Sequence, residues 1–464
     1  MTAGFVGVTI VVCVVLGPPG VGKTCIKYLL LDQRPPHLRS STICAETPLR
    51  IEIKRISEAR IQTLEGNWKE VKGEEMLDTI ARMILLAERD TTSSLNAEMP
   101  LKEATKKHKN VLTKIFNWVA NQGKKDASSA KKAAAGKGGP SPKHDACQSA
   151  TKKIMDKLVQ CITKLKREGS ELQITSHSVA EQLLRSMWVY FSDCGGQPQY
   201  HELLPLFVRR ISSALCVTRL TDKLDEIQAV EYYDKGKRVG VPQQSQLSAK
   251  DTIKCLVNTI QSYSTHDKPP SIIMVGTHLD QLQEKMKQLP PSEASSESSG
   301  ATSQSQSPAS ERIETLEEKN KQLLEMLEPE FSDQLVYFSS DMKQLLFPLN
   351  TLSRGTREKS IAHTLRSAVE KSGAREVKVP VWWYVLELLL QELSKELGRG
   401  ILKRAECLQI AQLLNIQEQS LDAALEYFNE LNIIKYSPKV LPDVIFVDSQ
   451  IPLDKVSELV YATC

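Results

Sequence analysis

The first part of the chain combines two hydrophobic patterns. Residues 6–16 are a nearly continuous run of apolar, mostly β-branched side chains, which predicts a buried strand of a parallel sheet. Residues 23–31 carry apolar positions at helical spacing, and residues 49–56 alternate apolar and polar positions as a half-buried strand does. The intervening residues 32–48 are polar and contain paired prolines, which predicts a loop.

The same patterns return from residue 186 onward. Amphipathic helices are predicted at 251–263, 311–327 and 358–371. Strands that alternate with helices predict an α/β domain, which we expect to extend over residues 1–375. Its further strands are predicted at 186–192, 211–217 and 270–276, with two short strands, placed to form a hairpin, at 335–339 and 345–350.

Residues 376–464 predict a second, mostly helical domain. Three helices and a two-stranded wing indicate a winged-helix-like module. Its third helix is acidic, so nucleic-acid phosphate would repel it, and we expect a protein-facing module with no nucleic-acid partner. The helices are predicted at 382–397, 404–414 and 419–431, and the strands at 433–436 and 444–448.

Two insertions, at about 70–176 and 286–310, interrupt the α/β pattern and are predicted to be largely disordered. Helical spacing is present within the first at 74–87 and 161–167. Between residues 102 and 168, 17 Lys and Arg stand against 5 Asp and Glu. Within the low-complexity stretch at 124–142 no aromatic residues are interleaved with the lysines for base stacking. A solvated linker is favoured there over membrane contact or nucleic-acid binding, because charge runs are usually solvated.

Length and cysteine content limit which classes of protein this chain can belong to. A chain of 464 residues predicts two or three folded units. Its 10 cysteines include no C-x-x-C pair and no Cys/His cluster at zinc spacing, which favours a reduced, cytoplasmic compartment. Residues 5–16 are too short to span a bilayer and follow no basic segment, so we expect a strand there and no signal peptide.

The loop after the first strand matches the phosphate-loop pattern G-x-x-x-x-G-K-[ST]. Its glycines let backbone N–H groups converge on a phosphate at a helix N-terminus. Lys23 is expected to reach the β- and γ-phosphates, and the Thr24 hydroxyl to bind Mg²⁺. The alternative is a glycine-rich turn that binds nothing. The predicted nucleotide-binding residues here are Gly17, Pro18, Pro19, Gly20, Val21, Gly22, Lys23, Thr24 and Cys25.

Acidic and hydroxyl residues follow two other strands. Asp193, at the end of the strand at 186–192, is predicted to hold Mg²⁺ through water. Gly196 is expected to donate its N–H to a γ-phosphate, and Gln197 to orient an attacking water. Thr42, in the loop before the second strand, is the candidate for contact with Mg²⁺ and γ-phosphate, and Thr47 is the alternative.

A third strand end carries Thr277, His278 and Asp280. The Asp280 carboxylate suits the N1–H and exocyclic amine of guanine, a donor pair that adenine lacks. The alternative is an aspartate that caps the next helix. For the loop that packs on the base, Asn350 and Thr351 are the candidates, with Ser339 and Ser340 as alternatives.

Together, Gly17 to Thr24, Thr42, Asp193 to Gln197 and Thr277 to Asp280 resemble the ordered motifs of a small GTPase. With the C-terminal segment, residues 4–56 and 185–464 resemble the Roc-COR, or Roco, family. This resemblance implies a P-loop NTPase (Ras-like GTPase) domain followed by the winged-helix part of a COR domain. Thr-His-Leu-Asp stands where small GTPases generally have Asn-Lys-x-Asp, and Roco proteins often have Thr-His-x-Asp. Thr277 is shorter than an asparagine, and Pro198 stiffens the segment after Gln197.

The resemblance implies a regulatory GTPase that binds Mg²⁺ with GTP or GDP, hydrolyses GTP slowly and contacts protein effectors or regulators. It also implies a possible homodimer, since COR segments carry much of the dimerisation in that family. Two alternatives stay open: a nucleotide-binding scaffold without hydrolysis, and an ATP-dependent oligomerising switch.

Overall fold

The structure of the chain is a computed structural model. It describes residues 5–35, 45–46, 48–55, 66–85, 142–171, 187–196, 204–205, 208–234, 237–263, 269–288 and 314–463. Among these residues, no helix combines the length and the apolar character that crossing a membrane would require. The predictions for Thr42, Thr47 and Gln197, and for nearly all of the lysine-rich stretch at 124–142, lie outside the described residues.

A nine-stranded sheet forms the centre of the molecule, in the order β10-β8-β5-β1-β4-β2-β3, with β9 beside β8 and β11 beside β1. The pairs that join β10, β8, β5, β1 and β4 are parallel, and β2, β3 and β11 run antiparallel to their neighbours. The parallel-rich sheet confirms the predicted α/β class. The strands are β1 (Phe5–Leu16), β2 (Leu49–Arg55), β3 (Gly66–Glu70), β4 (Met187–Asp193), β5 (Ser213–Arg219), β8 (Ser271–Thr277), β9 (Leu335–Val336), β10 (Phe347–Pro348) and β11 (Arg375–Pro380).

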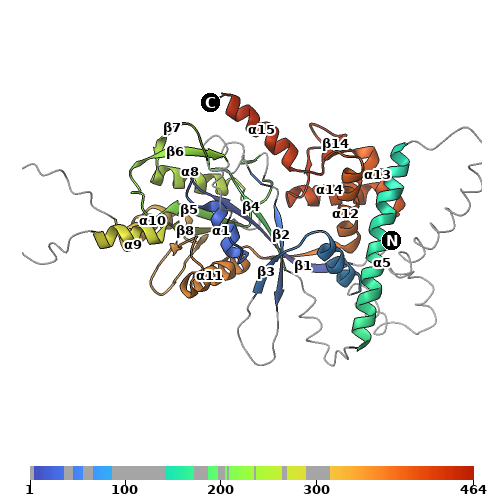
Figure 1. Cartoon of the computed structure of the whole chain (residues 1–464), viewed down its shortest axis with the longest axis horizontal. Helices are drawn as coiled ribbons and strands as arrows, with labels where there is room; N and C mark the ends of the chain where they lie inside the picture. The colour runs from blue at the N-terminus through green and yellow to red at the C-terminus, as the bar shows by residue number, and fades with distance from the viewer. Residues whose placement is uncertain are drawn as a thin grey trace, which may run out of the picture.

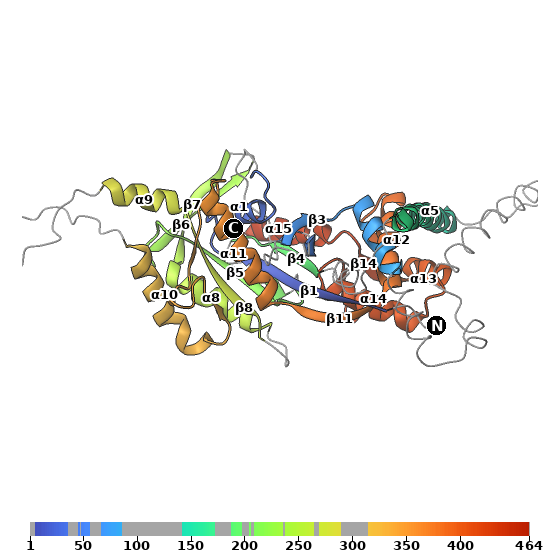
Figure 2. The same ribbon diagram turned by 90° about the horizontal axis from the view of Figure 1, so that it is seen from below.

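Helices cover both faces of this sheet (Figures 1 and 2). Val11, Cys13 and Val15 of β1 share one core with α1 (Lys23–Leu30) and α11 (Thr356–Ser372). Val14 and Leu16 point to the other face, where they share a core with α8, α9 and α10. These helices are α8 (Ala249–Gln261), α9 (Leu279–Gln288) and α10 (Leu316–Phe331). The second half of β1 is therefore a continuous apolar run because both of its faces are buried.

The first half of β1 belongs to a third core. Val6, Val8 and Ile10 pack with α12 (Val381–Glu396) and the helices that follow it. β11 pairs antiparallel with this half of β1 and leads directly into α12, as Figure 2 shows. Tyr384 of α12 stacks on Trp188 of β4, with ring centroids 6.3 Å apart. The chain after residue 375 is thus packed on the sheet through a shared core.

The C-terminal part contains more regular structure than the sequence pattern predicted. The three predicted helices are present, and the sheet that accompanies them has three strands, in the order β12-β14-β13, instead of two. The sequence pattern did not reveal β12, a three-residue strand that leads directly into α13, or α15, whose hydrophobic pattern is weak. The elements are β12 (Ile401–Lys403), α13 (Arg404–Leu413), α14 (Glu418–Glu430), β13 (Lys435–Tyr436), β14 (Val444–Phe446) and α15 (Gln450–Thr463).

The first predicted insertion contributes two helices to the core. Residues 74–85 are helical, and α5 (Pro142–Glu171) is a 30-residue helix. Buried side chains of both, including Ile80, Ile84 and Leu158, join the core of α12 and α13. These parts of 70–176 are ordered because one apolar stripe per helix is enough for packing, even where the other faces are rich in lysine.

Two further departures concern short strands. The predicted hairpin of 335–339 with 345–350 is wrong as a main pairing, because β9 and β10 each pair in parallel with β8. Only a single bridge joins Ser339 to Gln344. The antiparallel pair of β6 (Ile227–Asp234) and β7 (Lys237–Ser248) was not predicted, since its many polar residues give no clear alternation.

Candidate functional site

The phosphate loop lies where the order of the sheet reverses. From β1 the sheet continues to β4 on one side and to β5 on the other, both parallel to β1. In open α/β sheets, ligands bind outside the carboxyl ends of the strands at such a point. The loop between β1 and α1 occupies this position, so the fold places Gly17 to Thr24 where a ligand is expected.

Glycine is required at two positions of this loop. A side chain at Gly17 would bring its Cβ within 2.3 Å of the Val217 carbonyl oxygen of β5. Gly22 immediately precedes α1 with φ of 90°, a left-handed conformation that other residues adopt with strain. These glycines allow the backbone to turn tightly from the strand into the helix.

Lys23 is folded back onto the loop. Its Nζ donates to the carbonyl oxygens of Gly17 and Pro18, each at 2.8 Å, and the side chain is buried. Burial lowers the pKa of Lys23 to about 8, although the nearby Asp193 carboxylate opposes this shift. The lysine is therefore a buried cation positioned against the loop that would hold phosphate.

Thr24 and Asp193 meet across 169 positions of sequence. The Thr24 hydroxyl donates to Asp193 Oδ2 at 2.6 Å, and Asp193 is almost fully buried. Burial raises the pKa of Asp193, and the Glu46 carboxylate adds to the shift, while the Thr24 hydrogen bond and Lys23 oppose it. Two hard oxygen donors at the edge of a phosphate loop suit Mg²⁺, which is bound by one or two protein oxygens together with phosphates and water.

Glu46 is a site residue that the sequence did not reveal. Its carboxylate accepts from Lys27 Nζ at 2.5 Å, and its backbone N–H donates to the Asp193 carbonyl at 2.9 Å. Ala45 forms a bridge with Cys194 beside it. Lys27 follows Lys23 by one helical turn and so lies on the same face of α1, which was the available signal. Nothing in the local pattern identified its acidic partner.

Gly196 lies against the phosphate loop. A Cβ at this position would come within 2.5 Å of Lys23 Nζ, of the Pro18 carbonyl carbon and of the Pro19 nitrogen. Only glycine allows this close approach. At Gly196 the chain therefore approaches the loop through its backbone.

Three side chains from two other loops converge on Gly22. A Cβ there would meet Thr351 Oγ1 at 3.6 Å, Thr277 Cγ2 at 3.9 Å and His278 Cε1 at 4.0 Å. The Thr277 hydroxyl lies 2.6 Å from the Val21 carbonyl and 3.2 Å from that of Thr218, and 3.0 Å from His278 Nδ1. Thr277 thus joins the end of β8 to the phosphate loop.

Asp280 and Asn350 are placed differently from Thr277. Asp280 is exposed in the first turn of α9, a position that suits both base recognition and the alternative of a helix-capping aspartate. Asn350 Oδ1 accepts from the N–H groups of Leu352 and Ser353, so this side chain shapes its own loop. Arg354 anchors that loop to the end of α1 by donating to the Gln33 carbonyl at 2.6 Å.

Comparisons with known proteins give little further guidance. No protein-family model matches the chain, and no curated protein matches it. Among solved structures, it is similar to the Methanosarcina barkeri Roco2 RocCORdC protein bound to GDP, with 9% sequence identity and a TM-score of 0.42. The match covers 99% of this chain and 79% of that chain. This likeness is too distant to assign a family.

Proposed function

We propose that this protein is a regulatory GTPase of the Roc-COR type. The observation that supports it best is the convergence of Lys23, Thr24 and Asp193 at the carboxyl end of β1, with the Thr24 hydroxyl 2.6 Å from Asp193. A glycine-rich turn without a ligand would not need a buried lysine and a buried carboxylate from a distant strand at the same edge. Burying such charges is unfavourable unless a ligand or an oppositely charged group compensates them.

In this proposal, several groups of the chain bind different parts of the phosphate chain. The N–H groups of residues 20–24 surround the β-phosphate, and Lys23 exchanges its two carbonyl acceptors for β- and γ-phosphate oxygens. The Gly196 N–H binds the γ-phosphate, and Gln197 orients the attacking water. Thr24 and Asp193 would hold Mg²⁺, which neutralises phosphate charge when bound.

The base-recognition part rests on the two loops around Gly22. Asp280 accepts the N1–H and amine of guanine, while His278 and Thr351 border the base and ribose side of the loop. Thr277 stabilises the phosphate loop instead of contacting the base, because its hydroxyl already contacts the Val21 carbonyl. Guanine selectivity in this proposal therefore depends on Asp280.

The C-terminal part contacts the segments that would respond to the γ-phosphate. The Arg209 N–H donates to Asn432 Oδ1 at 3.2 Å, and Arg210 pairs with Glu430 at 3.0 Å. Leu453 of α15 is buried in the same core as Ala45 and Cys194. In the proposed switch, a change near Asp193 on loss of γ-phosphate is transmitted through these contacts to α14 and α15 and then to a protein effector.

Replacing Thr24 with alanine is expected to remove most of the Mg²⁺ dependence of nucleotide binding. Wild-type affinity for GTP should rise on adding Mg²⁺, and the variant should lose at least about tenfold of that gain because a metal-ligating oxygen is missing. Binding in EDTA should change little. Fluorescence titration of labelled GTP with and without Mg²⁺ measures both values.

Thr364→Ala is a suitable control, because this exposed hydroxyl bonds only within its own helix. Thr24→Ser should restore the Mg²⁺ response. An unchanged Mg²⁺ response in Thr24→Ala would contradict the proposed metal site. Following phosphate release in the same samples separates a GTPase from a scaffold that binds without hydrolysis.

A further inference from the structure

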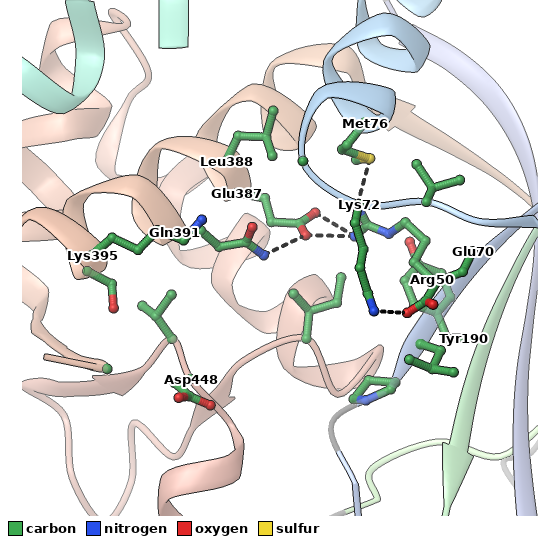
Figure 3. Close-up of a pocket in the computed structure, with 18 of the residues that line it drawn as sticks. Arg50, Glu70, Lys72, Met76, Tyr190, Glu387, Leu388, Gln391, Lys395 and Asp448 are labelled. Atoms are coloured by element: carbon green, nitrogen blue, oxygen red, sulfur yellow. Dashed lines mark hydrogen bonds and ion pairs between the residues drawn. The ribbon is translucent and has the colours of Figure 1, made fainter. Parts of the chain in front are cut away.

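A cavity lies at the seam between the sheet and the C-terminal part. Its volume is about 780 Å³, within the range of small-molecule sites. β2, β4 and the helix of residues 74–85 form one side, and α12 with the segments around β12 and β14 forms the other (Figure 3). None of the predicted nucleotide-binding residues lines it.

The inner end of the cavity is built around Arg50. Its guanidinium donates to both carboxylate oxygens of Glu387, at 2.8 and 2.6 Å, and lies 5.3 Å from the ring centres of Trp188 and Tyr190. Figure 3 shows this pair at the centre of the site. Arg50 and Glu387 neutralise each other, so the inner end carries no net charge from this pair.

The Tyr190 hydroxyl is the unusual group of this site. Tyr190 is 1% exposed, and among the residues that the structure describes its hydroxyl has no hydrogen-bond acceptor. Leaving a buried donor without an acceptor is unfavourable, which is why such groups are rare in folded proteins. A ligand oxygen accepting from this hydroxyl would remove the penalty.

The walls and the mouth define the rest of the ligand. Leu49, Val71, Leu388 and Val447 give the cavity apolar walls. At the mouth, the Lys395 side chain is 75% exposed, and its carboxylate partner Glu392 lies 4.0 Å away and pairs more closely with Lys153. Lys72 and Glu70 pair with each other and so add no net charge, and the Asp448 carboxylate accepts from the Gln450 N–H. Lys395 is therefore the group at the mouth that favours an anion.

We propose that this cavity binds a small organic acid with three features in a row. A carboxylate lies beside Lys395 at the mouth, an apolar body contacts the walls, and an oxygen acceptor reaches the Tyr190 hydroxyl. Bound there, the ligand touches both the sheet and α12, so it would bias how the two parts pack. The inference does not depend on the proposed nucleotide site.

Three probes of equal chain length separate the features. 10-Hydroxydecanoate carries both the charge and the second oxygen, decanoate lacks the oxygen, and 1,10-decanediol lacks the charge. Calorimetric titration of the full chain should show saturable binding of one 10-hydroxydecanoate per chain, about fivefold to tenfold tighter than either other probe.

Tyr190→Phe should lower the affinity for 10-hydroxydecanoate to that for decanoate, and it should leave the affinity for decanoate unchanged. Lys395→Gln should weaken both acids and leave the diol unchanged. Lys455→Gln is the matched control, because Lys455 is exposed in α15 outside the cavity, and it should change nothing. Thermal midpoints of all variants check that they fold.

Three results would overturn the proposal. These are no binding of any probe, equal affinity for all three, and affinities that Tyr190→Phe and Lys395→Gln leave unchanged in folded protein.

Discussion

Replacing Lys23 with methionine is expected to reduce guanine-nucleotide affinity by about a hundredfold, because charge-assisted hydrogen bonds to two phosphates are lost. Methionine is apolar and of similar length, so it can fill the buried space that Lys23 occupies. Lys378→Met is the control, since this lysine is exposed in β11. Titration with a fluorescent GDP analogue measures the affinity.

The same substitution should not destabilise the protein. Burial lowers the pKa of Lys23 to about 8, whereas an unfolded chain titrates near its ordinary value of 10.5. The folded state therefore binds fewer protons between these values, and wild-type stability should rise with pH across this window. The unfavourable contribution, of order 3 kcal/mol at most, is fully present below pH 8.

Lys23→Met lacks this contribution, so its stability advantage over wild type should be largest at pH 7 and shrink toward pH 10. Asp193 loses a favourable neighbour in the variant, which reduces the advantage. Thermal midpoints of both proteins between pH 7 and 10 measure the difference. A variant with unchanged nucleotide affinity would contradict the phosphate role of Lys23, and a difference independent of pH would contradict its buried charge.

Replacing Glu387 with leucine is expected to destabilise the protein by roughly 3–5 kcal/mol, because it leaves the Arg50 charge buried without its partner. The side chains of Arg50 and Glu387 are only 10% and 4% exposed. Burial opposes the charged form of Arg50, but Glu387, together with the Tyr190 and Tyr384 hydroxyl groups, outweighs this and raises the pKa of Arg50. Arg50→Met should have an effect of similar size.

The double variant Arg50→Met/Glu387→Leu should recover most of the lost stability, since no unpaired charge remains buried. Urea unfolding of the four proteins completes the cycle. The exposed pair of Lys455 and Glu458 is the control, and removing one partner there should change stability by less than about 1 kcal/mol. Additive effects of the two core substitutions would show that the pair does not couple the sheet to α12.

Local pattern predicted the elements that carry the site. β4, β5, β8 and the second half of β1 are buried on both faces, so their sequences are continuous apolar runs that leave little ambiguity. The positions of Gly17 and Lys23 were predicted from the phosphate-loop motif, because that motif depends only on residues close together in the sequence. Asp193 was predicted because it is an acidic residue at the end of a buried strand, followed by two glycines.

Pattern could not predict what depends on distant pairing. β11 has a mixed sequence, and its place is set by pairing with a distant strand, β1. Phe5 lies opposite Pro380 and Ile10 opposite Arg375. The Glu46 contact with Lys27 and the cavity around Tyr190 also arise from packing between segments that are far apart. Helical spacing was visible at 74–87 and 161–167, but the length of α5 and the packing of both helices into the core were not predicted.

Guanine recognition by Asp280 is tested most directly by one competition titration. Purified, nucleotide-stripped protein and its Asp280→Ala variant are titrated with GTP, GDP and ATP in Mg²⁺ against a fluorescent guanine nucleotide. Wild type should prefer GTP and GDP to ATP by at least about a hundredfold, and the variant should lose most of that preference. A preference for ATP, or a guanine preference that Asp280→Ala leaves intact, would contradict the proposed function.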